Sequence, residues 1–441
     1  MSNLAYASLM GSLGLFVGTG FSIDVSGGRA PRFEELLRRV AGQLEVEWSD
    51  SDARFLRRSL PQVASLLVEL TATNRNVSWS EAERALKAEV ARLTDVMPAS
   101  RQLSDKLKAL TLAWIVTTNY DLVLESLIDE AESLQAHQPF VARYGGLPIY
   151  HLHGHRRFPE SIKITEEDYV SMVGPLDYQR LKLPLLMVES TTLMLGYGLG
   201  DVNVRAAMAW ARGFCGDQGL VLDGAQGMVV QAFYSPGSSS SAPYYGPDGE
   251  LVLQVASIGE LLDEVYAVRE ELRLGLQNLR DSISAFLSSA DNAVRVAVDD
   301  QTRQAFLELV KKAQWPLCAT SVLLDFLDRA LAPVWEEAVK PNQFSYYETY
   351  LALVLDVIER LEPNEIHPNL VAYVGDALDR VGEYIGDGTG YAWAATRTWR
   401  VRAPQIDAEL ARLLSEYGRA HGKASLDRLI TPLTSSANSG T

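Results

Sequence analysis

Cysteine is scarce in this sequence. Only Cys215 and Cys318 occur among 441 residues, too few for a disulfide framework or for the four thiolates of a structural zinc site. The sequence also lacks an apolar run of about 18 residues and a basic segment leading to a cleavage-site pattern. We therefore expect no membrane helix, no secretory signal and a reducing, cytoplasmic compartment.

Positive charge is also in short supply. Lys and Arg number 40 against 56 Asp and Glu, which gives a formal net charge of -16 at pH 7. Both the part before residue 258 and the part after it are acidic. Proteins that bind DNA or RNA rely on clusters of Lys and Arg to neutralise phosphates. The composition therefore argues against direct nucleic-acid binding.

The rest of the composition is that of a globular protein. Hydrophobic residues make up 47% of the chain and charged residues 22%, a balance that excludes wholesale disorder. At about 100–200 residues per domain, the length predicts two or three domains.

Short apolar runs alternate with helical periodicity up to residue 258, which predicts a mostly parallel sheet with helices on both faces. The predicted strands are 13–17, 112–116, 148–152, 193–195, 228–233 and 251–255. The predicted helices are 33–44, 60–73, 80–93, 121–131 and 202–212. No strand pattern occurs between residues 50 and 110, so we read about 45–110 as a helical insertion.

The second half of the chain has a different pattern. After a Ser/Gly/Pro-rich stretch at 235–249, which predicts a loop between two strands, residues 259–430 carry almost only helical periodicity. We predict an α/β domain over 1–258, an all-α domain over 259–430 and a flexible tail over 431–441.

The first candidate motif is Gly18-Thr19-Gly20-Phe21-Ser22, directly after the predicted strand 13–17. Paired glycines let a main chain approach a pyrophosphate closely. A tight turn is the alternative, because glycine serves turns readily and the third glycine of G-x-G-x-x-G is missing. Alone, the spacing favours the turn. The next helix is predicted to begin some ten residues further on.

The second motif, Thr117-Thr118-Asn119-Tyr120-Asp121, follows the predicted strand 112–116. Ligands of parallel sheets bind beyond the carboxyl ends of the strands, where an amide and a carboxylate can hold ribose hydroxyls or water. The alternative is a turn in which Asp121 caps the predicted helix 121–131. Alone, the pattern favours the cap.

The third motif is His151-Leu152-His153-Gly154-His155. If the strand continues through it, the three histidines lie on one side. A metal site needs a further carboxylate or thiolate, and the sequence offers none nearby. One histidine acting as acid or base is the second interpretation, and a turn histidine beside Gly154 is the third.

The fourth motif is the glycine-rich stretch 195–201, with Gly196, Gly198 and Gly200 ahead of Asp201 and the predicted helix 202–212. Three glycines exceed the need of an ordinary βα loop, so the stretch is a candidate nucleotide loop. Asp201 is expected to cap the helix.

In this order, the four stretches resemble the sirtuin family of NAD-binding proteins, especially its bacterial sirtuin-like branch. The first motif resembles the family's GAGxS loop with Thr19 in place of alanine, and Pro31-Arg32-Phe33 resembles the P-x-F that follows it. The second is similar to T-x-N-x-D, and His153-Gly154 to the catalytic His-Gly. Thr165-Glu166-Glu167-Asp168-Tyr169 and the stretch 195–201 are similar to later elements of the branch, so that the resemblance covers residues 10–258.

The resemblance implies a Rossmann-like domain with NAD as substrate. Protein deacylases of this family carry a zinc module of four cysteines, which two distant cysteines cannot form, so no zinc is expected. The implied activity is NAD+ hydrolysis at the nicotinamide–ribose bond, which gives nicotinamide and ADP-ribose. The resemblance also implies an anti-phage defence effector that depletes NAD.

Roles for individual residues are implied in the same way. Asn119 orients a ribose hydroxyl or the attacking water, and His153 is the general base. Asp121 binds ribose or nicotinamide, or supports its loop. The other implied cofactor-binding residues are Gly18, Thr19, Gly20 and Ser22 near the pyrophosphate, and Gly196, Gly198 and Asp201 on the adenosine side.

Partners are implied as well. The helices of 259–430 are expected to form homo-oligomers, and some members of the family act beside a HerA-type ATPase, so assembly or a partner is expected to gate the enzyme. Two alternatives remain: a sensor that binds NAD or ADP-ribose without cleaving it, and a scaffold subunit acting with such an ATPase.

Overall fold

The computed structural model divides the chain into two units, Met1–Glu270 and Glu271–Thr441. The division falls within helix α11 (Ile258–Ser288). The residues described are 1–49, 55, 57–135, 138–140, 145–171, 178–217, 227–234, 242–288, 292–314, 319–362, 366–386 and 392–437.

In the described part of the first unit, eight strands form one sheet in the order β3-β4-β2-β1-β5-β6-β8-β7. Neighbouring strands pair in parallel except β7, which is antiparallel to β8. The strands are β1 (Leu13–Val17), β2 (Leu112–Thr117), β3 (Ala131–Gln135), β4 (Leu147–His151), β5 (Thr191–Leu195), β6 (Val229–Tyr234), β7 (Tyr244–Tyr245) and β8 (Leu251–Val255). The predicted Rossmann-like, mostly parallel sheet is confirmed.

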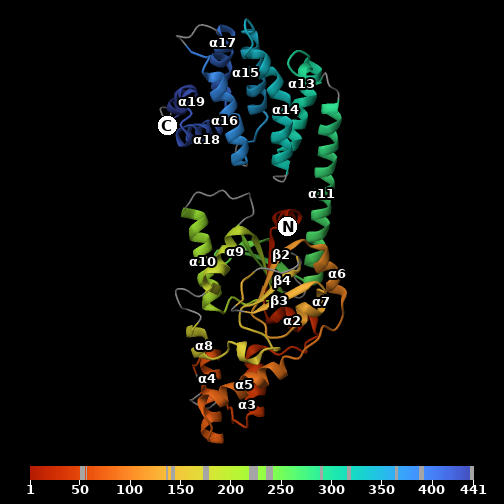
Figure 1. Ribbon diagram of the computed structural model, residues 1–441, viewed down its shortest axis with the longest axis vertical. Helices are drawn as coiled ribbons and strands as arrows, with labels where there is room; N and C mark the ends of the chain where they lie inside the picture. The colour runs from red at the N-terminus through yellow and green to blue at the C-terminus, as the bar shows by residue number, and fades with distance from the viewer. Residues whose placement is uncertain are drawn as a thin grey trace. The chain divides into compact units, whose positions relative to one another are not determined.

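Helices cover this sheet (Figure 1). On one face, Phe16 of β1 and Met194 of β5 belong to a core cluster with Met187 of α9 and Met208 of α10. β1 and β5 are buried along their whole length, as expected of central parallel strands. The helices of this unit before α11 are α1 (Ser2–Met10), α2 (Thr19–Val25), α3 (Phe33–Gln43), α4 (Leu60–Arg75), α5 (Trp79–Leu93), α6 (Gln102–Ala109), α7 (Val123–Leu127), η1 (Pro159–Ser161), α8 (Glu166–Ser171), α9 (Tyr178–Glu189) and α10 (Val202–Asp217).

Helices α3, α4 and α5 form a separate hydrophobic cluster, with Leu37, Leu67 and Leu86 fully buried in it. Capping boxes at Ser59 and Ser78 begin α4 and α5, since each serine is followed three residues later by Gln or Glu. α4 and α5 lie in the predicted insertion of about 45–110, whereas α3 precedes it.

Two predictions need correction, one at the edge strand β3 and one directly after the central strand β1. The helix predicted over 121–131 is only α7, Val123–Leu127, and the chain then forms β3, which pairs in parallel with β4. β3 was missed because it is a polar, half-buried edge strand without an apolar run. In addition, α2 begins at Thr19, within the glycine loop, so the helix that follows β1 starts at once and not some ten residues further on.

The second unit is all-α in its described part, as predicted. Its aromatic core includes Phe306 and Phe326, whose ring centroids are 5.1 Å apart. Besides the end of α11, the helices are α12 (Asn292–Arg295), α13 (Asp300–Ala313), α14 (Thr320–Ala338), α15 (Ser345–Ile358), α16 (Pro368–Gly382), α17 (Trp393–Arg402), η4 (Ala403–Gln405), α18 (Ala408–His421) and α19 (Ala424–Ala437). None of the helices in the described ranges is long and apolar enough to cross a bilayer.

The predicted tail 431–441 also needs correction. Residues 431–437 continue α19, and 438–441 lie outside the described residues. α19 is anchored before Pro432, where Leu426, Leu429 and Ile430 are buried and the helix packs against α16 and α18. The helix that begins in this packed part continues through residues 431–434, which are exposed or half-buried.

Candidate functional site

A cavity of about 490 Å³ lies at the carboxyl edge of the sheet, a volume typical of small-molecule sites. The loops that follow β1, β2, β4 and β5 supply its polar side, and the region of α3 to α5 supplies an apolar side. The polar lining includes Thr19, Thr118, Asn119, Asp121, His153 and Asp201, and the apolar lining includes Pro31, Phe33, Leu36, Leu60, Pro61 and Val96. The site therefore lies where β1 separates the two directions of strand order, as expected of doubly wound sheets.

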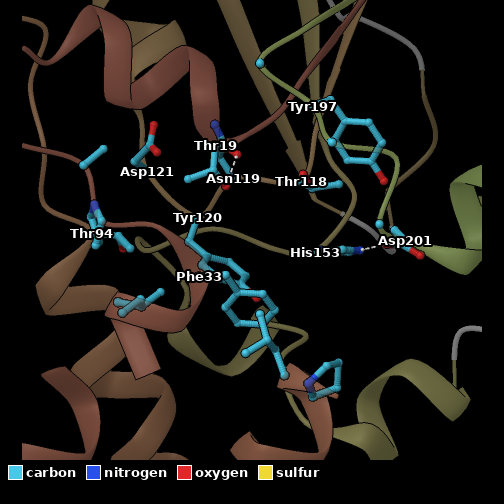
Figure 2. A pocket seen from close by; sticks show the side chains of 18 of the residues that line it. Thr19, Phe33, Thr94, Thr118, Asn119, Tyr120, Asp121, His153, Tyr197 and Asp201 are labelled. Carbon is cyan, nitrogen blue, oxygen red and sulfur yellow. Dashed lines mark hydrogen bonds and ion pairs between the residues drawn. The ribbon is translucent and has the colours of Figure 1, made fainter. Parts of the chain in front are cut away.

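Asn119 is fixed by a network of hydrogen bonds. Its Nδ2 donates to the carbonyl of Gly18 (3.0 Å) and to Ser22 Oγ (2.9 Å), and its Oδ1 accepts from Thr19 Oγ1 (3.3 Å). Figure 2 shows the contact with Thr19 on the cavity wall. The loop after β2 is thereby tied to the loop after β1, and the amide has one orientation.

Asp121 belongs to the same network through Ser22. Its Oδ1 accepts hydrogen bonds from Ser22 Oγ (3.1 Å) and from the backbone N–H of Val123 (3.1 Å). Burial raises the pKa of Asp121 and outweighs these two hydrogen bonds, which lower it. The net pKa therefore lies above its ordinary value. Asp121 thus lines the cavity and also accepts a hydrogen bond from the first residue of α7, whose N-cap position is taken by Leu122 and not by the predicted Asp121.

The glycines of the two nucleotide-like loops pack against each other. Gly20 N–H donates to the carbonyl of Gly196 (2.8 Å), and Gly196 has φ +60°, where a Cβ would lie 2.0 Å from the nitrogen of Phe21. A Cβ on Gly18 would lie 2.6 Å from the same carbonyl, whereas one on Gly198 would meet nothing within 4 Å. Close loop packing therefore explains Gly18, Gly20 and Gly196, but it does not explain Gly198.

His153 lies across the cavity from this network (Figure 2). Its Nε2 is 2.9 Å from Asp201 Oδ2, and the two side chains are 5% and 8% exposed. Within the described part of the chain, neither atom has a partner in hydrogen-bond geometry, so the contact is an ion pair and not an aligned hydrogen bond. The Tyr169 hydroxyl is 3.5 Å from His153 Nδ1.

Asp201 is held by backbone N–H groups as well as by His153. Its Oδ1 accepts from the backbone N–H of Asn203 (2.8 Å) at the start of α10, as the predicted helix cap requires. Burial raises the pKa of Asp201, but the His153 contact and the N–H groups of Asn203 and Val204 outweigh it, and the net pKa lies below its ordinary value. The carboxylate is therefore ionised at neutral pH.

The two tyrosines beside this pair keep their protons. Burial, then the charge of Asp201, raises the pKa of Tyr169 and of Tyr197 well above the ordinary value. Among the residues that the structure describes, the buried hydroxyl of Tyr197 has no partner in hydrogen-bond geometry. Tyr197 and the residue Glu125 described below were missed in the sequence; Tyr197 could have been found from its place between two glycines.

The three histidines do not share one side, because β4 ends at His151 and Gly154 turns the chain with φ +74°. His151 is fully buried; its Nδ1 contacts the Asn119 carbonyl (3.1 Å) and its Nε2 contacts Glu125 Oε1 (2.7 Å). His155 packs against His151, and burial followed by the charge of His151 lowers the pKa of His155 to about 4.

Of the predicted site residues, the cavity lining contains Thr19, Asn119, Asp121, His153, Gly196, Gly198 and Asp201. Gly18, Gly20 and Ser22 are not among its lining residues; they support the loops behind it. Across the described ranges, no group of three or more His, Cys, Asp or Glu is placed to hold a metal ion. The side chains of Cys215 and Cys318 lie outside the description.

Part of the chain matches a known protein family. Residues 113–227 match the family model of the SIR2-like domain, a segment that contains Asn119, His153 and Asp201. No curated protein sequence matches the chain. Together, the Rossmann-like sheet and this match support a SIR2-like domain in this α/β part of the chain and suggest a function related to NAD.

Proposed function

We propose that the protein is an NAD+ hydrolase that cleaves the nicotinamide–ribose bond and releases nicotinamide and ADP-ribose. The observation that carries the proposal is that Asn119 and His153, on the loops after two different strands, line one cavity. The SIR2-like match over the same loops supports NAD as the ligand.

The chemistry needs little beyond positioning, charge and one proton acceptor. Nicotinamide leaves as a neutral molecule because it takes the electron pair of the broken bond into its positively charged ring. The ribose becomes oxocarbenium-like, water attacks it, and His153 accepts the proton of that water. Asn119, held in one orientation, positions the water or a ribose hydroxyl.

The charge of the cavity is consistent with this reaction. The lining residues include Asp121 and Asp201 and no Lys or Arg among the described residues. An ionised Asp201 favours the positive charge of the pyridinium and of the transition state. The pyrophosphate must then be held by backbone N–H groups, for which the open loop at Gly198 and Gly200 is suited.

The biological role follows from the resemblance. In this proposal the enzyme depletes NAD as an anti-phage defence effector, and assembly through its C-terminal helices or a HerA-type ATPase partner gates its activity. A sensor or scaffold would instead leave bound NAD intact during long incubation.

The test is incubation of the full chain with NAD+, alone and with a candidate ATPase, followed by product analysis. We expect Asn119→Ala and His153→Ala to lower nicotinamide release by about 10²- to 10⁴-fold, the range that a general base supplies. Asn278→Ala and His421→Ala, at exposed positions on α11 and α18, are the matched controls. Full nicotinamide release by either cavity variant would exclude the assigned roles.

A further inference from the structure

The contact between His153 and Asp201 joins two loops. His153 follows β4, whereas Asp201 precedes α10, and the side chains meet with 2.9 Å between Nε2 and Oδ2. Both are almost fully buried, and burial of a carboxylate is costly unless it is paired. The pair is therefore a fixed part of the cavity wall.

Asp201 cannot move away from His153 without losing its other contact. Its Oδ1 is held by the N–H of Asn203 at the start of a helix, so only Oδ2 is left for the imidazole. A carboxylate held in this way orients a histidine and stabilises the imidazolium that forms when the ring accepts a proton.

We propose that Asp201 is a positioning residue for His153: its carboxylate lies against Nε2, favours the ring proton there and leaves Nδ1 as the proton acceptor. This inference rests on the proposed hydrolase function. It differs from the role that the sequence resemblance implies, in which Asp201 contacts the adenosine side of NAD.

The other nitrogen agrees with this assignment. Nδ1 faces the hydroxyl of Tyr169 at 3.5 Å. The hydroxyl keeps its proton, because burial and the Asp201 charge raise the pKa of Tyr169. A protonated phenol can donate a hydrogen bond, so this contact is compatible with a lone pair on Nδ1.

Asp201→Asn tests the inference, because asparagine keeps the shape and caps a helix as well as aspartate does. In the full chain we expect kcat for nicotinamide release to fall by at least about 10²-fold, with KM changed by less than about 3-fold. In the His153→Ala background the same substitution should cause a much smaller loss, because only the direct effect of the Asp201 charge on the transition state then remains. Asp407→Asn, the same change at the start of α18, is the control and should leave kcat unchanged.

A spectroscopic readout separates this inference from the proposed function. Histidine ¹⁵N–¹H correlation spectra of the full chain, assigned by comparison with His153→Ala, should show the Nε2–H form in the wild type and lose it in Asp201→Asn. Unchanged kcat, a rise in KM alone, or an unchanged His153 spectrum would overturn the inference. If the wild type releases no nicotinamide, the hydrolase proposal fails, and the spectra still decide whether Asp201 positions His153.

Discussion

At the residue scale, Asn119 depends on a buried partner that takes no part in the proposed reaction. His151 contacts the Asn119 carbonyl through Nδ1 and Glu125 through Nε2. A carbonyl only accepts hydrogen bonds, so Nδ1 of His151 carries a proton. Its other nitrogen, Nε2, contacts the carboxylate of Glu125. The loop after β2 is thus anchored to α7 through the end of β4.

This anchor predicts a pH-dependent stability. Burial raises the pKa of Glu125, but the hydrogen bond and the charge of His151 outweigh it and lower the net pKa. A lowered folded-state pKa means that Glu125 contributes its full stability above its unfolded pKa of about 4.3, and loses it as the pH falls through the folded value. Glu125→Gln should therefore reduce unfolding free energy by about 1–3 kcal/mol at pH 7, and the difference should shrink below pH 4.

Urea unfolding followed at several pH values measures this effect. Glu130→Gln, an exposed position a few residues further along the chain, is the control and should change stability by less than about 0.5 kcal/mol. A difference between Glu125→Gln and wild type that stays constant from pH 7 to pH 3 would contradict the assignment.

At the element scale, the loops after β1 and β5 make different demands on their glycines. Gly196→Ala places a side chain in a left-handed conformation and against the backbone of Phe21, so we expect a loss of about 2 kcal/mol or more in unfolding free energy. Gly198→Ala meets open space and should fold normally. Thermal unfolding measures both.

The same pair separates folding from ligand binding. If backbone at Gly198 approaches the dinucleotide, calorimetric titration of Gly198→Ala should show weaker NAD binding by about 10-fold, at unchanged stability. A stable Gly196→Ala variant would show that the two loops do not need to pack this closely.

Elements differed in how well the sequence predicted them. β1 and β8 have the predicted bounds, because buried parallel strands read as continuous apolar runs. β3 gave no such signal, since an edge strand with the sequence Ala131–Gln135 keeps polar residues half-buried. In the site, the motifs indicated which loops line the cavity, but tertiary packing sets the partner of each side chain. Sequence spacing therefore could not show that Glu125 contacts His151 or that Asp201 contacts His153.

At the scale of the whole molecule, assembly is the property that remains a prediction. α17 in the second unit carries Trp393 and Val401, 72% and 63% exposed, two turns apart on one helix. We expect light scattering to give a mass that is a multiple of 48.6 kDa, and Trp393→Glu combined with Val401→Glu to lower it.

Activity should follow assembly in the same samples. If association gates the enzyme, nicotinamide release per chain should fall when the double variant dissociates. A wild-type monomer of 48.6 kDa with full activity would contradict gating by assembly.

The cavity is built from two hydrophobic clusters that are separate in the structure. The loops bearing Asn119 and His153 follow strands of the sheet, whereas Leu36, with Phe33 packed beside it, belongs to the cluster of α3 to α5, which Tyr120 also joins. Substitutions at Phe33 or Leu36 can therefore change the shape of the apolar wall, provided that Tyr120, the neighbour of Asn119, keeps its packing.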